Sequence, residues 1–278
     1  MRLLTSAISP VGSMYFCKTD TGLGNALFQI ASIYGISKSL GIGCTFPRVA
    51  EYIAELNKFN YRHGETILRN VPTLTAATDS FDMISENIMN DGIAYNKTYN
   101  KDLVTYIQNA TTNLMICGHL EDFKYFEHEF HSVREMFSCD DATRALLQER
   151  YGSILSGNTV AVHFRDYSKV NNPELDIVPE FYRRSIQYIK ERVPNPLFLI
   201  FTDNKNCVDI SIFSDCTYAF ISNEVDYLDL YCMSFCKHAI ISQSTFSWWA
   251  CFLNESPNKI VVYDKKYTYN YLTMFTSI

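Results

Sequence analysis

The second half of this 278-residue chain predicts an α/β fold with a parallel sheet. Short apolar runs alternate there with segments of helical periodicity, and each apolar run is continuous, as in Leu197–Phe201. Polar residues follow several of these runs directly. Continuously apolar strands are typical of parallel sheets that helices cover on both faces.

The elements of this half can be assigned in chain order. We predict strands at 160–163, 197–201, 217–221, 238–242 and 259–263, and helices at 179–192, 223–235 and 246–253. In the first helix, Phe181, Ile186 and Ile189 supply the apolar face. Asn223 is a suitable N-cap for the second helix, and Ser244 or Thr245 for the third.

The first half is less regular. We predict a strand at 14–17, a turn at 21–24, a helix at 25–40, a strand at 114–117 and a long aromatic-rich helix at 121–137. Residues 47–110 show no clear periodicity. Polar residues and two glycines at 151–158 indicate a boundary, so we expect two domains, 1–155 and 156–278.

The amino-acid composition and charge exclude some classes of function. Hydrophobic residues make up 47% of the chain, which is enough for a sizeable core, and the net charge of −6 argues against a nucleic-acid surface. The N-terminal residues 1–12 are too short for a membrane span and poor as a signal peptide. The nine cysteines form no CxxC pair, which favours free thiols in a reducing compartment. We therefore expect a cytoplasmic protein without a membrane span.

Two groups of residues are weak metal candidates. Cys232 and Cys236 are spaced by one helical turn, and His128 and His131 stand beside two glutamates. Core packing explains the cysteines better, and a solvated helix face explains the histidines better. We expect no metal site.

Ligands of parallel α/β sheets bind outside the carboxyl ends of the strands. This rule selects His163–Asp166, Thr202–Asn204 and Ser242–Thr245, each of which follows a predicted strand. Arg165 could neutralise a diphosphate there, or form an ordinary surface ion pair.

The segment Ser244–Trp249 lies where a strand gives way to a helix. Its hydroxyl groups and the helix N-terminus suit a phosphate, and the adjacent aromatic ring could stack on a base. Alternatively, the hydroxyls only cap the helix and both tryptophans fill the core.

Gly22 and Gly24 allow a ligand to approach the backbone closely. They match only part of the dinucleotide-binding fingerprint, because Leu27 replaces the third glycine and no acidic residue follows at the expected distance. A nicotinamide-dependent oxidoreductase is therefore weakly supported.

Together, five segments resemble glycosyltransferase family 11, the α-1,2-fucosyltransferases. They occur in the family's order over residues 21–254. Residues 22–29 resemble its GLGNQMFQ opening, 118–126 its GYFQSEKYF-like stretch, 162–167 its HIRRGDY motif, 201–204 its FSDD, and 229–249 its D-LMS-CKH-IIANSTFSWW.

The resemblance implies a GT-B fold, in which two Rossmann-like domains face a cleft. The first domain would lie on the acceptor side, and the second would bind the nucleotide sugar. It also implies an inverting transfer to a glycan hydroxyl from GDP-fucose or a related GDP-sugar, without metal or another cofactor. The missing anchor is typical of soluble bacterial or viral enzymes.

Roles for the catalytic side follow from the motif positions. Arg165 would bind the donor diphosphate and neutralise the leaving group, and His163 would help to shape the same site. A general base would activate the acceptor hydroxyl. Asp166 is the first candidate for that base, followed by Glu174 and Asp176.

The remaining motif positions would bind the nucleotide. Ser244 and Thr245 would donate hydrogen bonds to phosphate, Phe246 would lie against guanine, and Asp229 would face the guanine edge. Asp203 belongs to the same site. From the first domain, Gly24 and Asn25 would approach the donor.

The chain departs from the family pattern at several of these positions. The HIRRGDY motif has lost an arginine and its glycine, Ala26 replaces a glutamine, and Gln243 replaces an asparagine. A different GDP-sugar thus remains open, as does a non-catalytic relative that binds carbohydrate or nucleotide.

Overall fold

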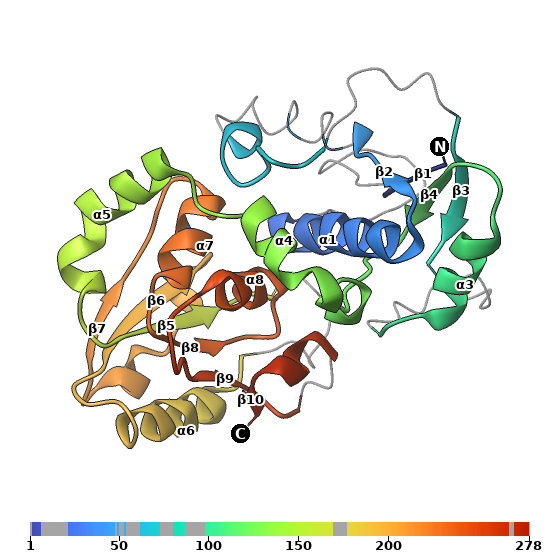
Figure 1. The fold of residues 1–278 in the computed structure, drawn as a ribbon. Coiled ribbons are helices and arrows are strands. Elements are labelled where there is room, and N and C mark those ends of the chain that lie inside the picture. Colours follow the sequence, from blue (N-terminus) through green and yellow to red (C-terminus); the bar gives the residue numbers. More distant parts are fainter. Residues whose placement is uncertain are drawn as a thin grey trace. The chain divides into compact units, whose positions relative to one another are not determined.

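The computed structural model describes residues 2–6, 22–47, 49, 53, 62–72, 80–86, 98–168, 177–266 and 270–277. The strand predicted at 14–17 lies outside these residues, as do Glu174 and Asp176. The chain divides into two compact units, Met1–Ser138 and Cys139–Ile278 (Figure 1). None of the described helices is long and apolar enough to cross a membrane.

The first unit is built on a parallel four-stranded sheet of order β2-β1-β4-β3. Its elements are β1 (Leu3–Ser6), α1 (Leu23–Leu40), β2 (Gly43–Cys44), β3 (Asp82–Ser85), α3 (Lys101–Asn109), β4 (Leu114–Cys117) and α4 (Phe130–Met136), with the 3-10 helices η1 (His63–Glu65), η2 (Phe123–Tyr125) and η3 (Glu127–Glu129). The helix and the strand predicted at 25–40 and 114–117 correspond to α1 and β4.

Helix α1 is the central helix of this unit. It is apolar over most of its circumference and buried along most of its length, from Leu23 to Ser37. A Cβ atom on Gly35 would lie 2.3 Å from the carbonyl oxygen of Tyr125. Only glycine therefore lets η2 pack directly against the helix.

The single helix predicted at 121–137 is wrong. The segment contains η2, η3 and α4 in succession. The Asp122 carboxylate accepts a hydrogen bond from the backbone N–H of Lys124, and Phe126 leaves the helical region with φ −136°. This break allows the Phe126 ring to enter the core, 5.9 Å from the ring of Phe130.

The second unit contains a parallel six-stranded sheet of order β10-β9-β8-β5-β6-β7, which confirms the predicted parallel α/β arrangement. Its elements are α5 (Asp141–Leu155), β5 (Thr159–Phe164), α6 (Pro179–Lys190), β6 (Leu197–Thr202), η5 (Lys205–Cys207), η6 (Ile210–Phe213), β7 (Thr217–Phe220), α7 (Asp226–Ser234), β8 (His238–Ile241), α8 (Thr245–Leu253), β9 (Val261–Tyr263), η7 (Asn270–Met274) and β10 (Thr276–Ser277).

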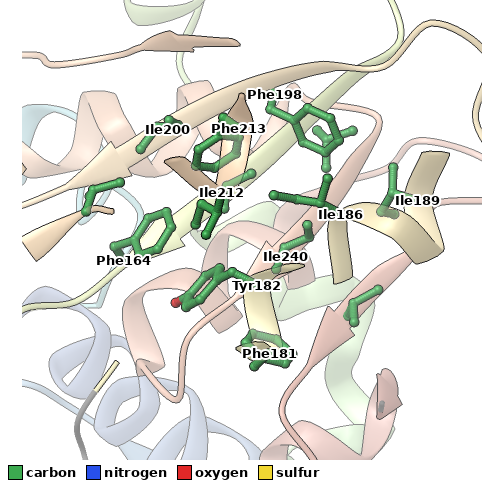
Figure 2. Close-up of a cluster of buried hydrophobic side chains, with 14 of the residues drawn as sticks. Phe164, Phe181, Tyr182, Ile186, Ile189, Phe198, Ile200, Ile212, Phe213 and Ile240 are labelled. Carbon is green, nitrogen blue, oxygen red and sulfur yellow. The ribbon is translucent and has the colours of Figure 1, made fainter. Parts of the chain in front are cut away.

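One face of this sheet is covered by α6 and η6 (Figure 2). Phe164 of β5 stacks on Tyr182 of α6 with ring centroids 4.0 Å apart, and Phe213 of η6 closes the cluster. The alternate residues of β5 point to the opposite face, on the side of α7 and α8 (Figure 1). There Trp248 and Trp249 are fully buried.

Two helix starts test the capping predictions. Ser244 caps α8 by accepting a hydrogen bond from the backbone N–H of Phe246, as predicted. Asn223 does not cap α7, whose N-cap residue is Val225. The side-chain oxygen that a cap would need instead accepts a hydrogen bond from the Tyr151 hydroxyl at 3.1 Å, while the amide nitrogen of Asn223 donates to Asp229.

Candidate active site

The second sheet reverses its strand order between β5 and β8. From β5 the chain proceeds outward through β6 and β7, and then returns to add β8, β9 and β10 on the other side. Ligands of such open sheets bind at this reversal, outside the carboxyl ends of the strands. The three predicted segments, His163–Asp166, Thr202–Asn204 and Ser242–Thr245, all follow β5, β6 or β8 at this edge.

Arg165 leaves the end of β5 and pairs with Asp203, which follows β6. Its guanidinium lies 2.5 Å from the Asp203 carboxylate, and 48% of its side chain is exposed. The other Asp203 oxygen accepts the backbone N–H of Asp166 at 3.0 Å. Asp203 thus holds Arg165 while about half of the arginine side chain stays exposed to solvent.

Asp166 is tied into the loop that follows β5. One carboxylate oxygen accepts the backbone N–H of Ser168 at 2.9 Å, and the other accepts the side-chain amide of Asn204 at 2.8 Å. Hydrogen bonds to a carboxylate stabilise its charged form and weaken it as a base. The geometry favours a loop-fixing role.

His163 is buried at the end of β5. Its Nδ1 lies 2.8 Å from the Ser242 hydroxyl, and its ring centroid lies 5.8 Å from that of Phe246. Burial, with a smaller contribution from the Arg165 charge, lowers the pKa of His163 to about 3. The imidazole is therefore neutral at ordinary pH and links β5 to β8.

The N-terminus of α8 completes this edge. Ser244 is buried, whereas Thr245 and Phe246 are half-buried in the first turn of the helix. The backbone N–H groups of such a turn, with the positive end of the helix dipole, favour an anion. The structure thus brings hydroxyls, an aromatic ring and the Arg165 guanidinium to one sheet edge.

A small pocket opens at the strand reversal. It is lined from the ends of β5, β8 and β9 and from the start of α6 by Arg165, Tyr167, Ile177, Val178, Phe181, Tyr182, Ser242, Gln243 and Asp264. The Tyr182 hydroxyl donates to the backbone carbonyl of His163 at 2.9 Å, which fixes the wall of the pocket.

Asp229 lies in α7 and anchors the loop that follows β7. Its carboxylate accepts both the backbone N–H and the side-chain amide of Asn223, at 3.2 and 2.7 Å. Burial raises the pKa of Asp229 to about 6, although these hydrogen bonds lower it. Its predicted contact with a guanine edge would have to share this carboxylate with Asn223.

The first unit brings its predicted residues to the edge of its own sheet. Gly24 is buried in the first turn of α1, and Asn25 follows it with its side-chain amide 3.3 Å from Nδ1 of His119. His119 belongs to the turn after β4. The glycine turn at 22–24 is thus a helix start, with Gly22 as the N-cap.

The residues considered as weak metal candidates are buried or make other contacts. Cys232 and Cys236 are buried, and Nε2 of His128 lies 3.0 Å from the carbonyl oxygen of Gly35. Within the described ranges, no group of three or more His, Cys, Asp or Glu residues could hold a metal ion.

Sequence reasoning assigned no role to Ser242, Tyr182, Glu86 and Glu121. Ser242 lies within a segment selected at a strand end, and Tyr182 lies on a predicted helix. The sequence could therefore have placed both residues near the site. Glu121 lies within the quoted 118–126 stretch. Glu86 follows the short and largely exposed strand β3, in a region without a usable periodicity.

Comparison of the chain with models of protein families identifies its family. The family model for glycosyl transferase family 11 matches residues 72–273, well over half of the chain. The chain belongs to glycosyl transferase family 11. The prediction that it is a glycosyltransferase is thereby confirmed.

Relatives in sequence agree with membership of glycosyl transferase family 11. The O-antigen biosynthesis glycosyltransferase WbnK of Escherichia coli is 25% identical, over 91% of this chain and 94% of that protein. An alpha-1,2-colitosyltransferase of Escherichia coli is 32% identical over 49% of this chain and 50% of that protein. A galactoside 2-alpha-L-fucosyltransferase of Caenorhabditis elegans is 30% identical over 44% of this chain and 29% of that protein.

Solved structures show the same fold at low identity. The fucosyltransferase NodZ from Bradyrhizobium has a TM-score of 0.53 at 13% identity, and the alignment covers 91% of this chain and 92% of NodZ. A mutant of Arabidopsis thaliana FUT1 has a TM-score of 0.54 at 13% identity, with 96% and 71% covered. For this family 11 member, the predicted GT-B fold with two Rossmann-like units is confirmed.

Proposed function

We propose that this chain is an inverting fucosyltransferase that transfers fucose from GDP-fucose to a glycan hydroxyl. The observation that carries the proposal is the convergence of Arg165, the α8 N-terminus and the Ser244 and Thr245 hydroxyls at the strand reversal. A fucosyltransferase and a colitosyltransferase among its relatives support the sugar class. A NodZ crystal soaked with GDP-fucose, of the same fold, supports the donor.

The reaction needs positive charge at this edge. The acceptor oxygen bonds to the anomeric carbon, the bond from that carbon to the diphosphate oxygen breaks, and the acceptor proton passes to a base. GDP leaves with one additional negative charge. A preplaced guanidinium and helix N-terminus stabilise that charge in the transition state.

The remaining assignments extend this placement. Phe246 would lie against guanine, and Asp229 would reach the guanine edge through the loop held by Asn223. Asp203 would act on the donor by holding Arg165. Gly24 and Asn25 would approach the donor from the first domain, with the domains at 1–155 and 156–278.

Arg165 and the α8 dipole would also take the place that a divalent cation has in metal-dependent transferases, so we expect transfer to continue in a chelator.

A second candidate donor carries colitose in place of fucose. It is favoured by the E. coli colitosyltransferase, which is 32% identical over half of this chain.

Thermal unfolding in the presence of nucleotides tests the proposal. A ligand that binds only the folded protein stabilises it by RT ln(1 + [L]/Kd). We expect GDP to raise the Tm clearly more than UDP does at equal concentration, with or without EDTA. Equal shifts would contradict the guanine site. Transfer to a glycan array from donors carrying fucose or colitose then identifies the sugar.

A further inference from the structure

The loop between β7 and α7 is held by two neighbouring side chains of α5. The Tyr151 hydroxyl donates to the side-chain oxygen of Asn223 at 3.1 Å, and the Arg150 guanidinium donates to the same oxygen at 3.3 Å. Arg150 also pairs with Glu224 at 2.9 Å. Helix α5 thus fixes two successive residues of this loop.

These contacts determine which way the Asn223 amide faces. Because its oxygen accepts from two donors on α5, its nitrogen is turned toward α7. That nitrogen donates to Oδ1 of Asp229 at 2.7 Å, and the backbone N–H of Asn223 donates to the same oxygen at 3.2 Å. A rotated amide would set its oxygen against the Asp229 carboxylate and would lose the hydrogen bonds on both sides.

The two carboxylate oxygens of Asp229 consequently have different surroundings. Oδ1 accepts two hydrogen bonds, which occupy both of its lone pairs. Oδ2 accepts none from any residue that the structure describes, and Asp229 is only half-buried. The carboxylate is therefore fixed in direction through one oxygen, while the other oxygen can accept hydrogen bonds from a ligand.

Asp229 lies at the sheet edge where the nucleotide is proposed to bind. It belongs to the first turn of α7, which follows the carboxyl end of β7. Helix α8 begins after the carboxyl end of β8, and the two helices pack against each other (Figure 1). Because the strands are parallel, both helices begin at the same edge of the sheet. Asp229 and Phe246 therefore share this edge.

Guanine has a donor edge that such a carboxylate can recognise. Its N1–H and its N2 amino group lie side by side, and a carboxylate oxygen forms charge-assisted hydrogen bonds with donors of this kind. Adenine has an unprotonated N1 at the corresponding position, which a carboxylate repels. An oxygen held in one direction can therefore distinguish the two purines.

We propose that Asn223 and Tyr151 are positioning residues for guanine recognition, which hold Asp229 so that its Oδ2 accepts the guanine N–H donors. This rests on the function proposed above, and all the residues involved belong to the second unit. The hydrogen bonds run from α5 through the loop to α7. Helix α5 thus helps to select the base of the donor without touching it.

Calorimetric Kd values for GDP and ADP test the proposal, because these ligands differ only in the base. We expect the wild type to prefer GDP about a hundredfold. Asp229→Asn should lose this preference, because an amide held at its oxygen by Asn223 would face guanine with N–H groups. Asn223→Ala should lower the preference about tenfold, and Tyr151→Phe about threefold, since Arg150 still holds the Asn223 oxygen.

Tyr188→Phe is the matched control for Tyr151→Phe. Tyr188 is also half-buried on a helix of the second unit, and its hydroxyl makes no hydrogen bond with any described residue. Its removal should change neither Kd value. In every variant the Kd for ADP should stay at the wild-type value, because the diphosphate contacts and the fold are intact.

The pH dependence separates positioning from a general loss of structure. Burial raises the pKa of Asp229 to about 6, and the hydrogen bonds from Asn223 lower it. The preference for GDP should therefore fall as the pH drops through about 6, since the protonated carboxyl has lost its charge. In Asn223→Ala this midpoint should move to higher pH. The described charged and titratable groups around the carboxyl are Asp226, Glu224, Cys232, Arg150 and Tyr151.

The outcomes separate the two proposals. If the wild type binds GDP no better than ADP, the guanine site fails and the positioning fails with it. If Asp229→Asn keeps the wild-type preference, the base is recognised elsewhere, so the positioning fails while the proposed transfer stands. If Asp229→Asn loses the preference, an unchanged preference and pH midpoint in Asn223→Ala overturn the positioning alone.

Discussion

At the edge of the second sheet, the Arg165 guanidinium is held by the exposed carboxylate of Asp203, whereas at the edge of the first sheet the His119 imidazole faces the buried carboxylate of Glu121. Both edges therefore tether a nitrogen group with an acid. They differ in solvent access and in the permanence of the charge. A permanent cation such as the Arg165 guanidinium suits an anionic leaving group.

The two histidines sharpen this comparison. His163 is buried beside a hydroxyl and near the Arg165 charge, which keeps it neutral. His119 is partly exposed beside a carboxylate. The two histidines thus have different surroundings, a hydroxyl and a nearby cation at one edge and a carboxylate at the other.

The largest effect should come from Arg165. Arg165→Ala should lower kcat by roughly a hundredfold to a thousandfold, as when one oxyanion donor is removed. Arg165→Lys should also fall well below the wild type, because an ammonium cannot make a planar paired contact. Steady-state kinetics at saturating GDP-fucose measure both. The fold should survive, because the side chain packs little.

Arg183→Ala is the matched control, since Arg183 is similarly exposed and pairs with Asp209 on the surface of the same unit. Near-normal kcat for Arg165→Ala would show that the edge of the second sheet does not carry the leaving-group charge. The comparison between the two sheet edges would then no longer assign the leaving group to Arg165.

The next effect concerns Glu86 and stability. Burial raises the pKa of Glu86 to about 7, well above its ordinary 4.5, although two backbone N–H groups lower it. The folded state therefore keeps the proton when the unfolded state has lost it. This contribution to stability is complete below about pH 4.5 and disappears as the pH rises through about 7.

Glu86→Gln should remove this dependence. The free energy of unfolding of the variant, relative to wild type, should rise by roughly 3 kcal/mol between pH 4.5 and 8. Urea unfolding at several pH values measures the difference, and the parallel contribution of Asp229 cancels between the two proteins. A constant difference across this range would mean that the Glu86 carboxyl is solvated and has an ordinary pKa.

The smallest effect concerns the cap of α8. Ser244→Ala removes the hydroxyl that accepts the Phe246 N–H, and it should cost about 1 kcal/mol of stability. It should also reduce the Tm shift produced by GDP, because the helix start frays where the phosphate should bind. Ser214→Ala, at an exposed serine of the same unit, should change neither. An unaltered GDP shift in Ser244→Ala would limit Ser244 to capping.

Much of the second unit could be predicted because each of its helices and strands is marked by a local sequence signal. Each buried strand is a continuous apolar run, and α6 and α8 carry their own start signals in Pro179 and Ser244. The sheet edge then follows from strand direction alone. The ion pair between Arg165 and Asp203 could not be predicted, because it depends on which strands are neighbours.

The first unit was harder to predict, because several of its features depend on tertiary contacts. Strand β3 is largely exposed and lacks an apolar pattern, so Glu86 had no recognisable context. The break after Asp122 depends on Phe126 entering the core, which overrides the helical propensity of the segment. The predicted cap of α7 was wrong for a similar reason, because a tertiary contact with the Tyr151 hydroxyl occupies the side-chain oxygen of Asn223.

The aromatic packing of α8 gives the second unit an optical signal of its own. The chain has two tryptophans, Trp248 and Trp249, and both are fully buried in this one helix. Trp248 stacks on Phe252 at 5.1 Å and meets Trp249 edge-on at 5.0 Å. Indole fluorescence excited near its red edge therefore reports only on the second unit. Compared with far-ultraviolet circular dichroism, which averages over the whole backbone, it can reveal whether the two units melt together or in sequence.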